Sequence, residues 1–297
     1  MTTIITGSTG KLGTIIMQHL VNLIPPSSIT ATTRSPSSDG ARSLSSLGVH
    51  VVYADFSDAA SLVSAFSGAE KVLVMSVDQY GDAAVVSHKA AFDAAKKAGI
   101  KKIFYTSQIG AQEKSEFPPM PYHWRTEKIL EETGVDFTAF KNGFYMGFVP
   151  RLIGTVQSTK KLSCPVDGQV AYTSHADMGE AIAKLIASDS HTPTPRYVKL
   201  VNTNTWDMND IASILTKILG QPIEREVISD QQEQDALISK GVPERMIASI
   251  LGLYRSFRAG EFTTTDQCLS EVLGRECEGI EHFLEMDFAT KSREVNQ

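Results

Sequence analysis

Glycines spaced for a phosphate-binding turn lie at the start of the chain. Gly7, Gly10 and Gly13 follow the apolar, β-branched residues 2–6 and precede residues with helical apolar spacing. Such glycines let the backbone turn tightly and approach a pyrophosphate, which the first N–H groups of the helix attract. Phosphate-loop NTPases are excluded, because they need four residues between the glycines and Ser or Thr after the lysine. A tight turn without a ligand is the alternative. The residues expected to hold a pyrophosphate are Gly7, Thr9, Gly10, Lys11, Leu12 and Gly13.

An arginine ends the second expected strand. Arg34 lies 21 residues beyond Gly13 (34 − 13), where NAD-binding sites carry an acidic residue for the ribose hydroxyls. A guanidinium group can instead form charge-assisted hydrogen bonds to a 2′-phosphate. We therefore expect NADPH rather than NADH as the cofactor, with a solvated loop arginine as the alternative.

Three further pairs of residues follow expected strands. Ligands of a parallel sheet bind at the carboxyl ends of its strands, so these pairs are predicted to line the cofactor from adenine to nicotinamide. Phe56 could equally be core packing, and Ser107 could simply bond backbone groups. The pairs are Asp55 with Phe56, Ser76 with Val77, and Thr106 with Ser107.

Three side chains are the candidates for catalysis. Lys128 lies on an expected helix at residues 124–133, from which its long stem could reach the nicotinamide ribose. His123 directly precedes that helix and could donate a proton. Tyr145 could contact the substrate oxygen. The alternatives are a solvated lysine, a capping or surface histidine and a core tyrosine.

The residues before Tyr145 follow the expected strand at residues 136–141. Gly143 would let the chain approach the cofactor ring, and Phe144 with Tyr145 would form an aromatic wall for a flat ligand. Asn142, Gly143 and Phe144 are therefore predicted to touch the cofactor.

Strands and helices alternate through the first half of the chain, which predicts an α/β, doubly wound parallel sheet of the Rossmann type. From about residue 150 the pattern changes to long amphipathic helices with few strands. We expect a dinucleotide-binding domain at residues 1–150 and a smaller, mostly helical substrate domain at residues 151–297, interleaved with the first. Expected strands span residues 2–6, 29–33, 49–54, 71–76, 102–106 and 136–141, and expected helical segments span 82–98, 177–187, 208–219 and 229–258.

Composition narrows the class of protein. The apolar fraction of 42% and charged fraction of 21% are those of a globular chain, and the net charge of −6 argues against nucleic-acid binding. No apolar run approaches the roughly 18 residues of a membrane span, and no leader is expected before the first strand. The cysteines Cys164, Cys268 and Cys277 form no CxxC and no paired framework, which favours the cytoplasm and packing roles. No metal motif is present, and a homodimer is possible.

The chain resembles the NmrA-like branch of the atypical short-chain dehydrogenases/reductases, and within it the NADPH-dependent quinone oxidoreductase and triphenylmethane reductase type. The resemblance implies a Rossmann fold, NADPH and reduction of a small conjugated molecule. The matching motifs are GSTGKLG at residues 7–13, Thr33-Arg34, Ala54-Asp55, AAKKAGIKKIFYTS at residues 94–107, His123 with Thr126-Glu127-Lys128, NGFY at residues 142–145 and WDMNDIA at residues 206–212.

One departure from ordinary short-chain dehydrogenases bears on the reaction. Their proton-donating tyrosine stands four residues before the active lysine, where this chain has Trp124, and Tyr122 is out of register. An electron-poor quinone needs a strong general acid less than a ketone does. We therefore expect hydride transfer from NADPH to a quinone-like or other planar conjugated acceptor. The alternatives are an NADP(H)-sensing regulator that binds a protein partner, and an enone or imine reductase or isomerase of secondary metabolism.

Overall fold

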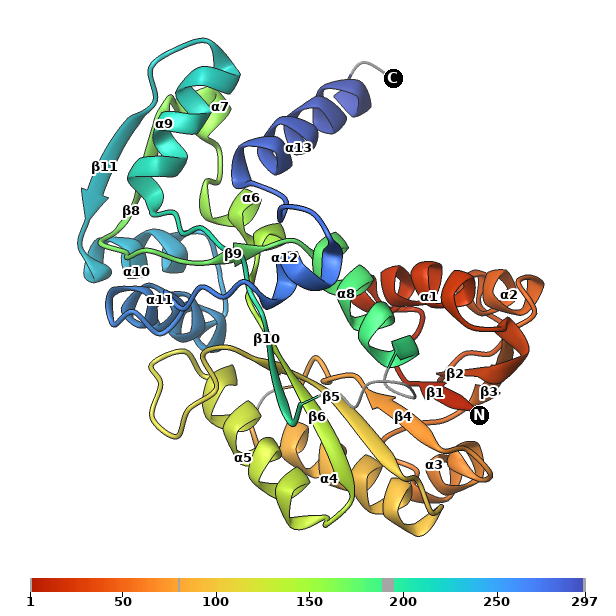
Figure 1. The fold of residues 1–297 in the computed structure, drawn as a ribbon. Helices are drawn as coiled ribbons and strands as arrows, with labels where there is room; N and C mark the ends of the chain where they lie inside the picture. Colours follow the sequence, from red (N-terminus) through yellow and green to blue (C-terminus); the bar gives the residue numbers. More distant parts are fainter. Residues whose placement is uncertain (1, 80, 189–194, 296–297) are drawn as a thin grey trace.

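The core of the protein is a seven-stranded parallel sheet (Figure 1). The computed structural model describes residues 2–79, 81–188 and 195–295. Every neighbouring pair of strands in the sheet is parallel, so the predicted doubly wound, Rossmann-type sheet is confirmed. From one edge to the other the strands are β10 (Tyr197–Leu200), β6 (Asp136–Asn142), β5 (Lys102–Gln108), β4 (Lys71–Val74), β1 (Thr3–Ile5), β2 (Ile29–Thr33) and β3 (His50–Tyr53).

The strand order reverses beside β1, and that reversal locates the ligand-binding edge. The chain runs from β1 outward to β2 and β3, and then returns to β4 on the other side of β1. Thr6 ties the two central strand ends together: its Oγ1 donates to the Leu73 carbonyl at 3.0 Å and accepts from the Met75 N–H at 2.9 Å. Ligands of such sheets bind at the carboxyl ends of the strands near this reversal.

Helices cover both faces of the sheet. On one face α1 packs closely against α8, and their apolar side chains join one buried cluster with those of α2 and α12. On the other face α3, α4 and α5 form a second cluster around Phe92 and Tyr105. These helices are α1 (Lys11–Leu23), α2 (Asp39–Ser46), α8 (His175–Ser188), α12 (Cys268–Leu273), α3 (Ala59–Phe66), α4 (Asp82–Lys97) and α5 (Pro119–Glu132).

The second half of the chain contributes to both parts of the molecule. Strand β10 adds to the edge of the main sheet beside β6, and α8 covers the sheet next to α1. The other elements pack around their own apolar core at the opposite end of the molecule (Figure 1). They are β7 (Phe144–Tyr145), α6 (Val149–Leu152), α7 (Val156–Thr159), β8 (Lys161–Pro165), β9 (Tyr172–Thr173), α9 (Met208–Leu219), β11 (Glu224–Ile228), α10 (Asp230–Ser239), α11 (Glu244–Arg258) and α13 (Ile280–Val295).

Two helical segments differ most from the sequence prediction. Helix α5 begins at Pro119, five residues before the expected start at 124, because proline suits the first position of a helix. The single helical block expected at residues 229–258 is two helices. Gly241 has a φ of +71°, and Pro243 restricts the residue before it, so the chain turns between α10 and α11.

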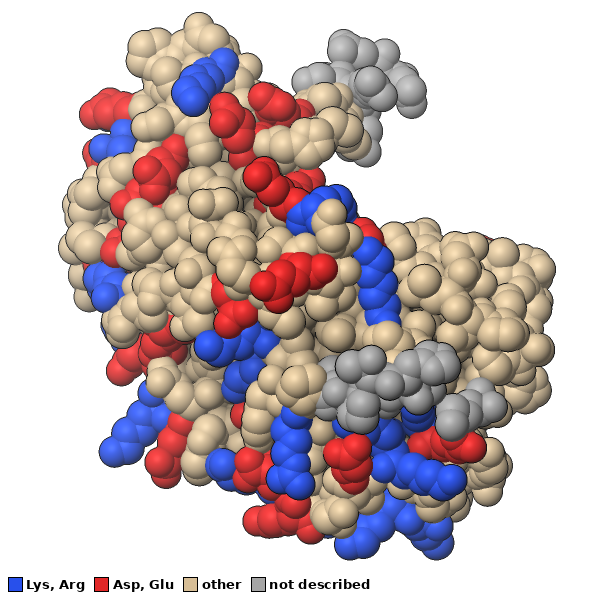
Figure 2. Space-filling view, in the orientation of Figure 1, with Lys and Arg blue, Asp and Glu red and all other residues tan. Residues whose placement is uncertain are grey.

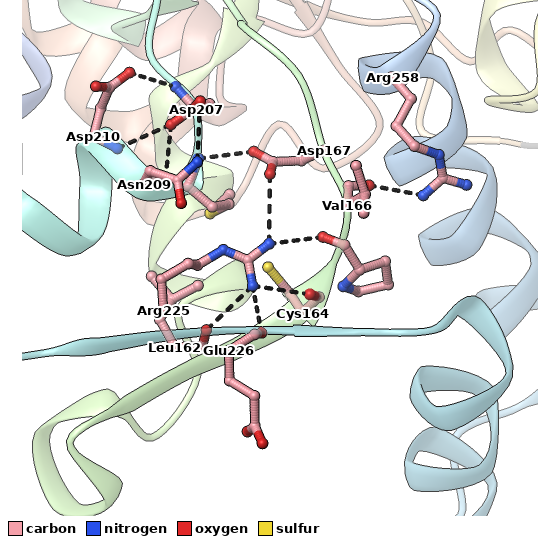
Figure 3. Close-up of polar contacts among 12 residues, drawn as sticks. Leu162, Cys164, Val166, Asp167, Asp207, Asn209, Asp210, Arg225, Glu226 and Arg258 are labelled. Carbon is pink, nitrogen blue, oxygen red and sulfur yellow. Dashed lines mark hydrogen bonds and ion pairs between the residues drawn. The ribbon is translucent and has the colours of Figure 1, made fainter.

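A buried arginine ties together the elements at the far end (Figure 3). Arg225 of β11 donates to the carbonyl oxygens of Cys164 at 3.0 Å and of Pro165 at 2.8 Å. Its guanidinium also lies 3.5 Å from the Asp167 carboxylate, which accepts from the Met208 N–H of α9 at 2.7 Å. The ion pair is nearly excluded from water, so it fixes β8, β11 and α9 relative to one another.

Candidate cofactor and substrate site

The glycine-rich turn has the geometry that a pyrophosphate needs. Gly7 has a φ of +59°, and the Gly10 N–H donates to the Gly7 carbonyl at 3.0 Å. A Cβ on Gly13 would lie 2.1 Å from that same carbonyl, so only glycine allows α1 to start this close to the turn. Helix α1 has no side-chain cap at Gly10 and no acidic residue in its first turn. Its first N–H groups are left for an anion, and the turn therefore fits a dinucleotide phosphate.

A second helix begins beside the first. A Cβ on Gly179 of α8 would lie 2.5 Å from Ile15 Cγ2 of α1, so a glycine permits the close contact between the two helices. At their N-termini, a Cβ on Gly147 would lie 3.0 Å from Lys11 Nζ and 3.6 Å from His175 Cε1. Two helix N-termini and the Lys11 ammonium group thus converge. The uncapped start of α1 and Lys11 favour a negatively charged ligand, whereas α8 is capped by Ser174 and has Asp177 in its first turn.

His175 is a site residue that the sequence analysis missed. Its ring stacks on Tyr145, with centroids 4.3 Å apart and planes 16° from parallel. Burial, with a smaller contribution from the Lys11 charge, lowers the pKa of His175 to about 4, so the ring is neutral at pH 7. The predicted wall for a flat ligand is therefore a pair of rings from β7 and the start of α8. The sequence does contain one signal for a helix start next to His175. Ser174 is a typical N-cap residue, and its Oγ accepts from the Asp177 N–H at 3.1 Å.

The segment that carries Tyr145 is partly site and partly core. Asn142 is fully buried, its Nδ2 lies 3.4 Å from the Tyr145 hydroxyl, and its Oδ1 has no hydrogen-bond partner in the described chain. An orphaned buried oxygen of this kind suits a donor on a ligand. A Cβ on Gly143 would lie 2.1 Å from Thr173 Oγ1, so close packing in the protein accounts for this glycine. Phe144 is 4% exposed among other aromatic rings and belongs to the core, not to a wall facing a ligand.

The residues at the ends of β4 and β5 bond to one another. Thr106 Oγ1 accepts from the Ser76 N–H at 2.8 Å and lies 3.2 Å from the Ser76 hydroxyl. Ser107 donates to the buried Glu127 carboxylate, and the Val77 N–H donates to His88 Nε2 at 3.0 Å. Ser107 therefore has an internal partner, as its alternative interpretation proposed, and these pairs form a rigid edge beneath the site.

Lys128 does not point toward the strand ends. It is half exposed on the outer face of α5, where its Nζ lies 3.0 Å from Glu131 Oε2. The preceding residue, Glu127, faces inward and forms a buried ion pair of 2.7 Å with Lys141 of β6. Successive helical residues are about 100° apart, so Glu127 and Lys128 cannot face the sheet together. The outward position of Lys128 therefore contradicts its predicted contact with the nicotinamide ribose. The lysine of this region that faces inward is Lys141.

His123 lies within the second turn of α5, not before the helix, and faces the sheet. Its Nδ1 is 2.9 Å from the Tyr105 hydroxyl of β5. Burial, with smaller contributions from His88 and the Lys141 charge, lowers the pKa of His123 to about 3. The ring is therefore neutral near pH 7, so His123 is not an imidazolium acid there.

Arg34 follows β2 as an exposed side chain beside Asp55. Two hydrogen bonds from Ser57 lower the pKa of Asp55, and the Arg34 charge adds a smaller effect. Phe56 is half-buried and packs against the cluster of α3 and α4. Arg42, by contrast, is bonded to Asp39 and to the Ser37 carbonyl. Of these two arginines, Arg34 therefore stays the candidate for a phosphate group beyond the end of β2.

Other functional classes find little support in the described residues. None of the groups of His, Cys, Asp and Glu described there could hold a metal ion, and none of the helices is long and apolar enough to cross a membrane. The three cysteines are free thiols, and burial raises the pKa of Cys164 to about 11. On the face in Figure 2, acidic and basic side chains are interspersed and the region over α1 and α2 is mostly uncharged.

Comparison with known sequences decides the family. The profile of the NmrA-like family matches residues 1–294. The chain belongs to the NmrA-like family. One relative in it is quinone oxidoreductase 2 of Escherichia coli, 30% identical over 271 residues, which cover 91% of this chain and 93% of the relative. The family expected from the sequence motifs is therefore confirmed.

Solved structures of NmrA-like proteins have the same fold. The NADPH complex of an NADPH-dependent quinone oxidoreductase from Escherichia coli superimposes with a TM-score of 0.87 at 28% identity, covering 96% of this chain and 99% of that one. The NADP(H) complex of the Citrobacter sp. triphenylmethane reductase has a TM-score of 0.84 at 27% identity, covering 94% and 98%. These relatives bear out the expectation of an NADPH-dependent oxidoreductase.

The buried neutral histidines predict how stability depends on pH. The folded-state pKa values of His88 (about 4) and His123 (about 3) lie below the value of 6.5 for an exposed histidine. The unfolded chain therefore binds protons below pH 6.5 that the folded protein does not. Stability should be complete above pH 6.5 and fall from there toward pH 5, by about 1.4 kcal/mol per pH unit for each histidine.

Urea unfolding at pH 7.5, 6.5, 5.5 and 5.0 measures this dependence. His88→Gln should be less stable at pH 7.5 and show a shallower loss on acidification. His282→Gln, at an exposed position of α13, should behave as the wild type does. A free energy of unfolding that stays constant from pH 7.5 to 5.0 would show that these histidines are not buried and neutral.

Proposed function

We propose that this chain is an NADPH-dependent reductase that delivers a hydride to a quinone-like or other planar conjugated acceptor. The observation that carries the proposal is the convergence of two helix N-termini, Lys11 and the Tyr145–His175 ring pair at the carboxyl ends of the strands. The uncapped start of α1, with Lys11, suits the phosphates of a dinucleotide, and the rings suit a flat ligand beside it. Its relatives in the NmrA-like family include quinone and dye reductases, which supports this class of acceptor.

The cofactor would lie along residues that the chain supplies for it. When bound, NADPH supplies the hydride, and the protein positions the reacting atoms and excludes water. The Gly7–Gly13 turn, with Thr9, Lys11 and Leu12, would hold the pyrophosphate, and Arg34 would bind the 2′-phosphate. The free Asn142 Oδ1 would accept a hydrogen bond from the nicotinamide end. Residues 1–150 would thus bind the cofactor, and residues 151–297 would close over the acceptor.

The groups around β5 and α5 favour an electron-poor acceptor. The count that assigns the usual tyrosine position to Trp124 starts from Lys128, which faces outward, whereas His123, which faces the sheet from α5, is neutral near pH 7. Without a charged acid, a simple ketone would lack the proton transfer that commonly contributes about 10²–10⁴-fold to the rate. A quinone accepts a hydride readily, and its oxyanion can then take a proton from water.

The function is tested by NADPH oxidation with the purified protein across benzoquinones, naphthoquinones, triphenylmethane dyes, enones and cyclic imines. Turnover of quinones or dyes with NADPH preferred over NADH is the expected result. Turnover of enones or imines alone would replace the acceptor class. Tight NADPH binding without any oxidation would refute the reductase and favour an NADP(H)-sensing regulator.

Arg34 is the residue expected to set the preference for NADPH over NADH. Arg34→Ala should weaken NADPH binding by more than about 10-fold, the value of one charge-assisted contact, and leave NADH binding unchanged. Isothermal titration with both cofactors measures the two affinities. Arg42→Ala is the matched control, because its guanidinium is already bonded to Asp39. An equal loss for NADPH and NADH, or a larger effect at Arg42, would remove Arg34 from the phosphate site.

A further inference from the structure

The connection between α12 and α13 lies along the first turns of α8. Arg275 donates to Asp177 Oδ1 at 2.8 Å and to Glu180 Oε2 at 2.7 Å. The Glu278 N–H donates to Asp177 Oδ2 at 2.7 Å. Asp177 is buried, and both of its oxygens thus bond to a segment 98 to 101 residues further along the chain. The connection therefore fixes the first turn of α8, where His175 is the first residue.

Asp177 occupies the position of a capping-box acid. Ser174 caps α8, and Asp177 is the third residue of that helix. In α9 and α10 the side chain at the same position bonds back to the N–H of the cap residue. In α8 the two carboxylate oxygens bond to Arg275 and Glu278. The side chain thus links the helix start to another part of the chain, through charge-assisted hydrogen bonds.

The backbone of Glu278 also reaches the strand beside Tyr145. Its carbonyl oxygen accepts from Asn202 Nδ2 at 2.9 Å, and the Asn202 N–H donates to Thr173 Oγ1 at 3.0 Å. Asn202 is fully buried and follows β10. Thr173 stands opposite Tyr145 in the pairing of β9 with β7. A path of two hydrogen bonds therefore leads from Glu278 to the strand that pairs with Tyr145.

These contacts close a circuit through the ring pair. Tyr145 comes from β7 and His175 from α8, and their ring centroids are 4.3 Å apart. The backbone of Glu278 holds α8 through Asp177, and it holds β9, the partner of β7, through Asn202. One backbone position thus supports both elements that carry the rings, and loss of either arm would let one ring move relative to the other.

We propose that Asp177 and Asn202, joined by the backbone of Glu278, are positioning residues for the ring pair. The inference rests on the proposed function, which puts the acceptor against those rings. Both side chains are buried, so they act on the acceptor through Tyr145 and His175. Such placement matters for the rate, because a displacement of about 1 Å can slow a reaction by about 10²-fold.

The stacking of the rings can be measured without cofactor or acceptor. The ring current of a stacked tyrosine shifts the carbon-bound protons of a histidine upfield, and histidine labelled with ¹³C shows these signals at pH 7.5. His175→Gln assigns the signals of His175, and Tyr145→Leu gives their position without the ring current. We expect the wild-type signals to lie upfield of that reference position.

Asp177→Asn breaks the first arm, because an amide NH₂ group cannot accept either of the two donors. We expect the His175 signals to move toward their position in Tyr145→Leu. The value of kcat/KM for the acceptor should fall by about 10- to 100-fold. NADP⁺ affinity should not change, because the glycine turn holds the cofactor. Glu180→Gln is the matched control, since it makes the same acid-to-amide change on α8 and also weakens a bond to Arg275. It should keep the wild-type signals and kinetics.

Asn202→Ala breaks the second arm. It removes the donor to the Glu278 carbonyl and keeps the backbone N–H that bonds to Thr173. We expect the same direction of change in the ring signals and in kcat/KM. Asn204→Ala is the matched control, because the Asn204 side chain is exposed. This pair keeps the inference testable should Asp177→Asn fail to fold.

Three results would overturn the inference. Wild-type ring signals in Asn202→Ala and in Asp177→Asn would show that other contacts hold the rings. Equal effects of Glu180→Gln and Asp177→Asn would assign the change to the general attachment of the connection. Displaced rings with full activity would show that the ring pair does not serve the acceptor.

The ring signals separate the inference from the proposed function. Turnover by the wild-type protein, with rings that stay in place in the variants, would refute the inference and leave the reductase standing. Rings displaced as expected, in a protein that turns over no acceptor, would support the hydrogen-bonded circuit and refute the reductase.

Discussion

The close approach of α1 and α8 is the constraint on which the site depends. Gly13 lets α1 begin against the Gly7 carbonyl, and Gly179 lets α8 pack onto Ile15 without a side chain between them. The two helix N-termini consequently meet at the strand ends, next to Gly147, Lys11 and His175. A larger residue at Gly13 or Gly179 would force the helices apart and separate Lys11 from His175. The proposed site therefore depends on the packing of two halves of the chain, and not on the glycine turn alone.

The rest of the structure holds that arrangement in place. Strand β10 joins the second half to the main sheet, and its Leu200 carbonyl accepts from the Gly143 N–H at 2.8 Å, just before Tyr145. The buried Glu127–Lys141 pair fixes α5 against β6, and loss of one partner would leave a buried charge at a cost of about 3–5 kcal/mol. At the far end the Arg225–Asp167 pair fixes β8, β11 and α9 (Figure 3). The ring pair and the helix starts are thus carried on elements that buried polar contacts make rigid.

The sequence predicted local features well and side-chain directions less well. The glycine turn, the parallel strands and the family follow from short-range patterns, because a strand–turn–helix junction is specified within about ten residues. Lys128 is a candidate in the sequence because its long stem lies on the helix before the sixth strand, whereas the helix phase, which depends on where α5 begins, puts Glu127 inside. His175 and the His88–Thr126 and Tyr105–His123 hydrogen bonds were missed because their partners lie far away in the sequence. Phe144 shows the same limit, since an aromatic residue beside a glycine fits a ligand wall and a core equally well.

Hydrogen–deuterium exchange with and without NADP⁺ shows whether the cofactor lies across the starts of both α1 and α8. If the cofactor lies across the two helix N-termini, NADP⁺ should protect residues 7–13, 142–147 and 174–178 together. Strand β11 (Glu224–Ile228), at the far end, should exchange as before. Binding that protects residues 7–13 but leaves residues 174–178 unchanged would contradict a shared site. Protection confined to other segments would show that the cofactor does not bind at these strand ends.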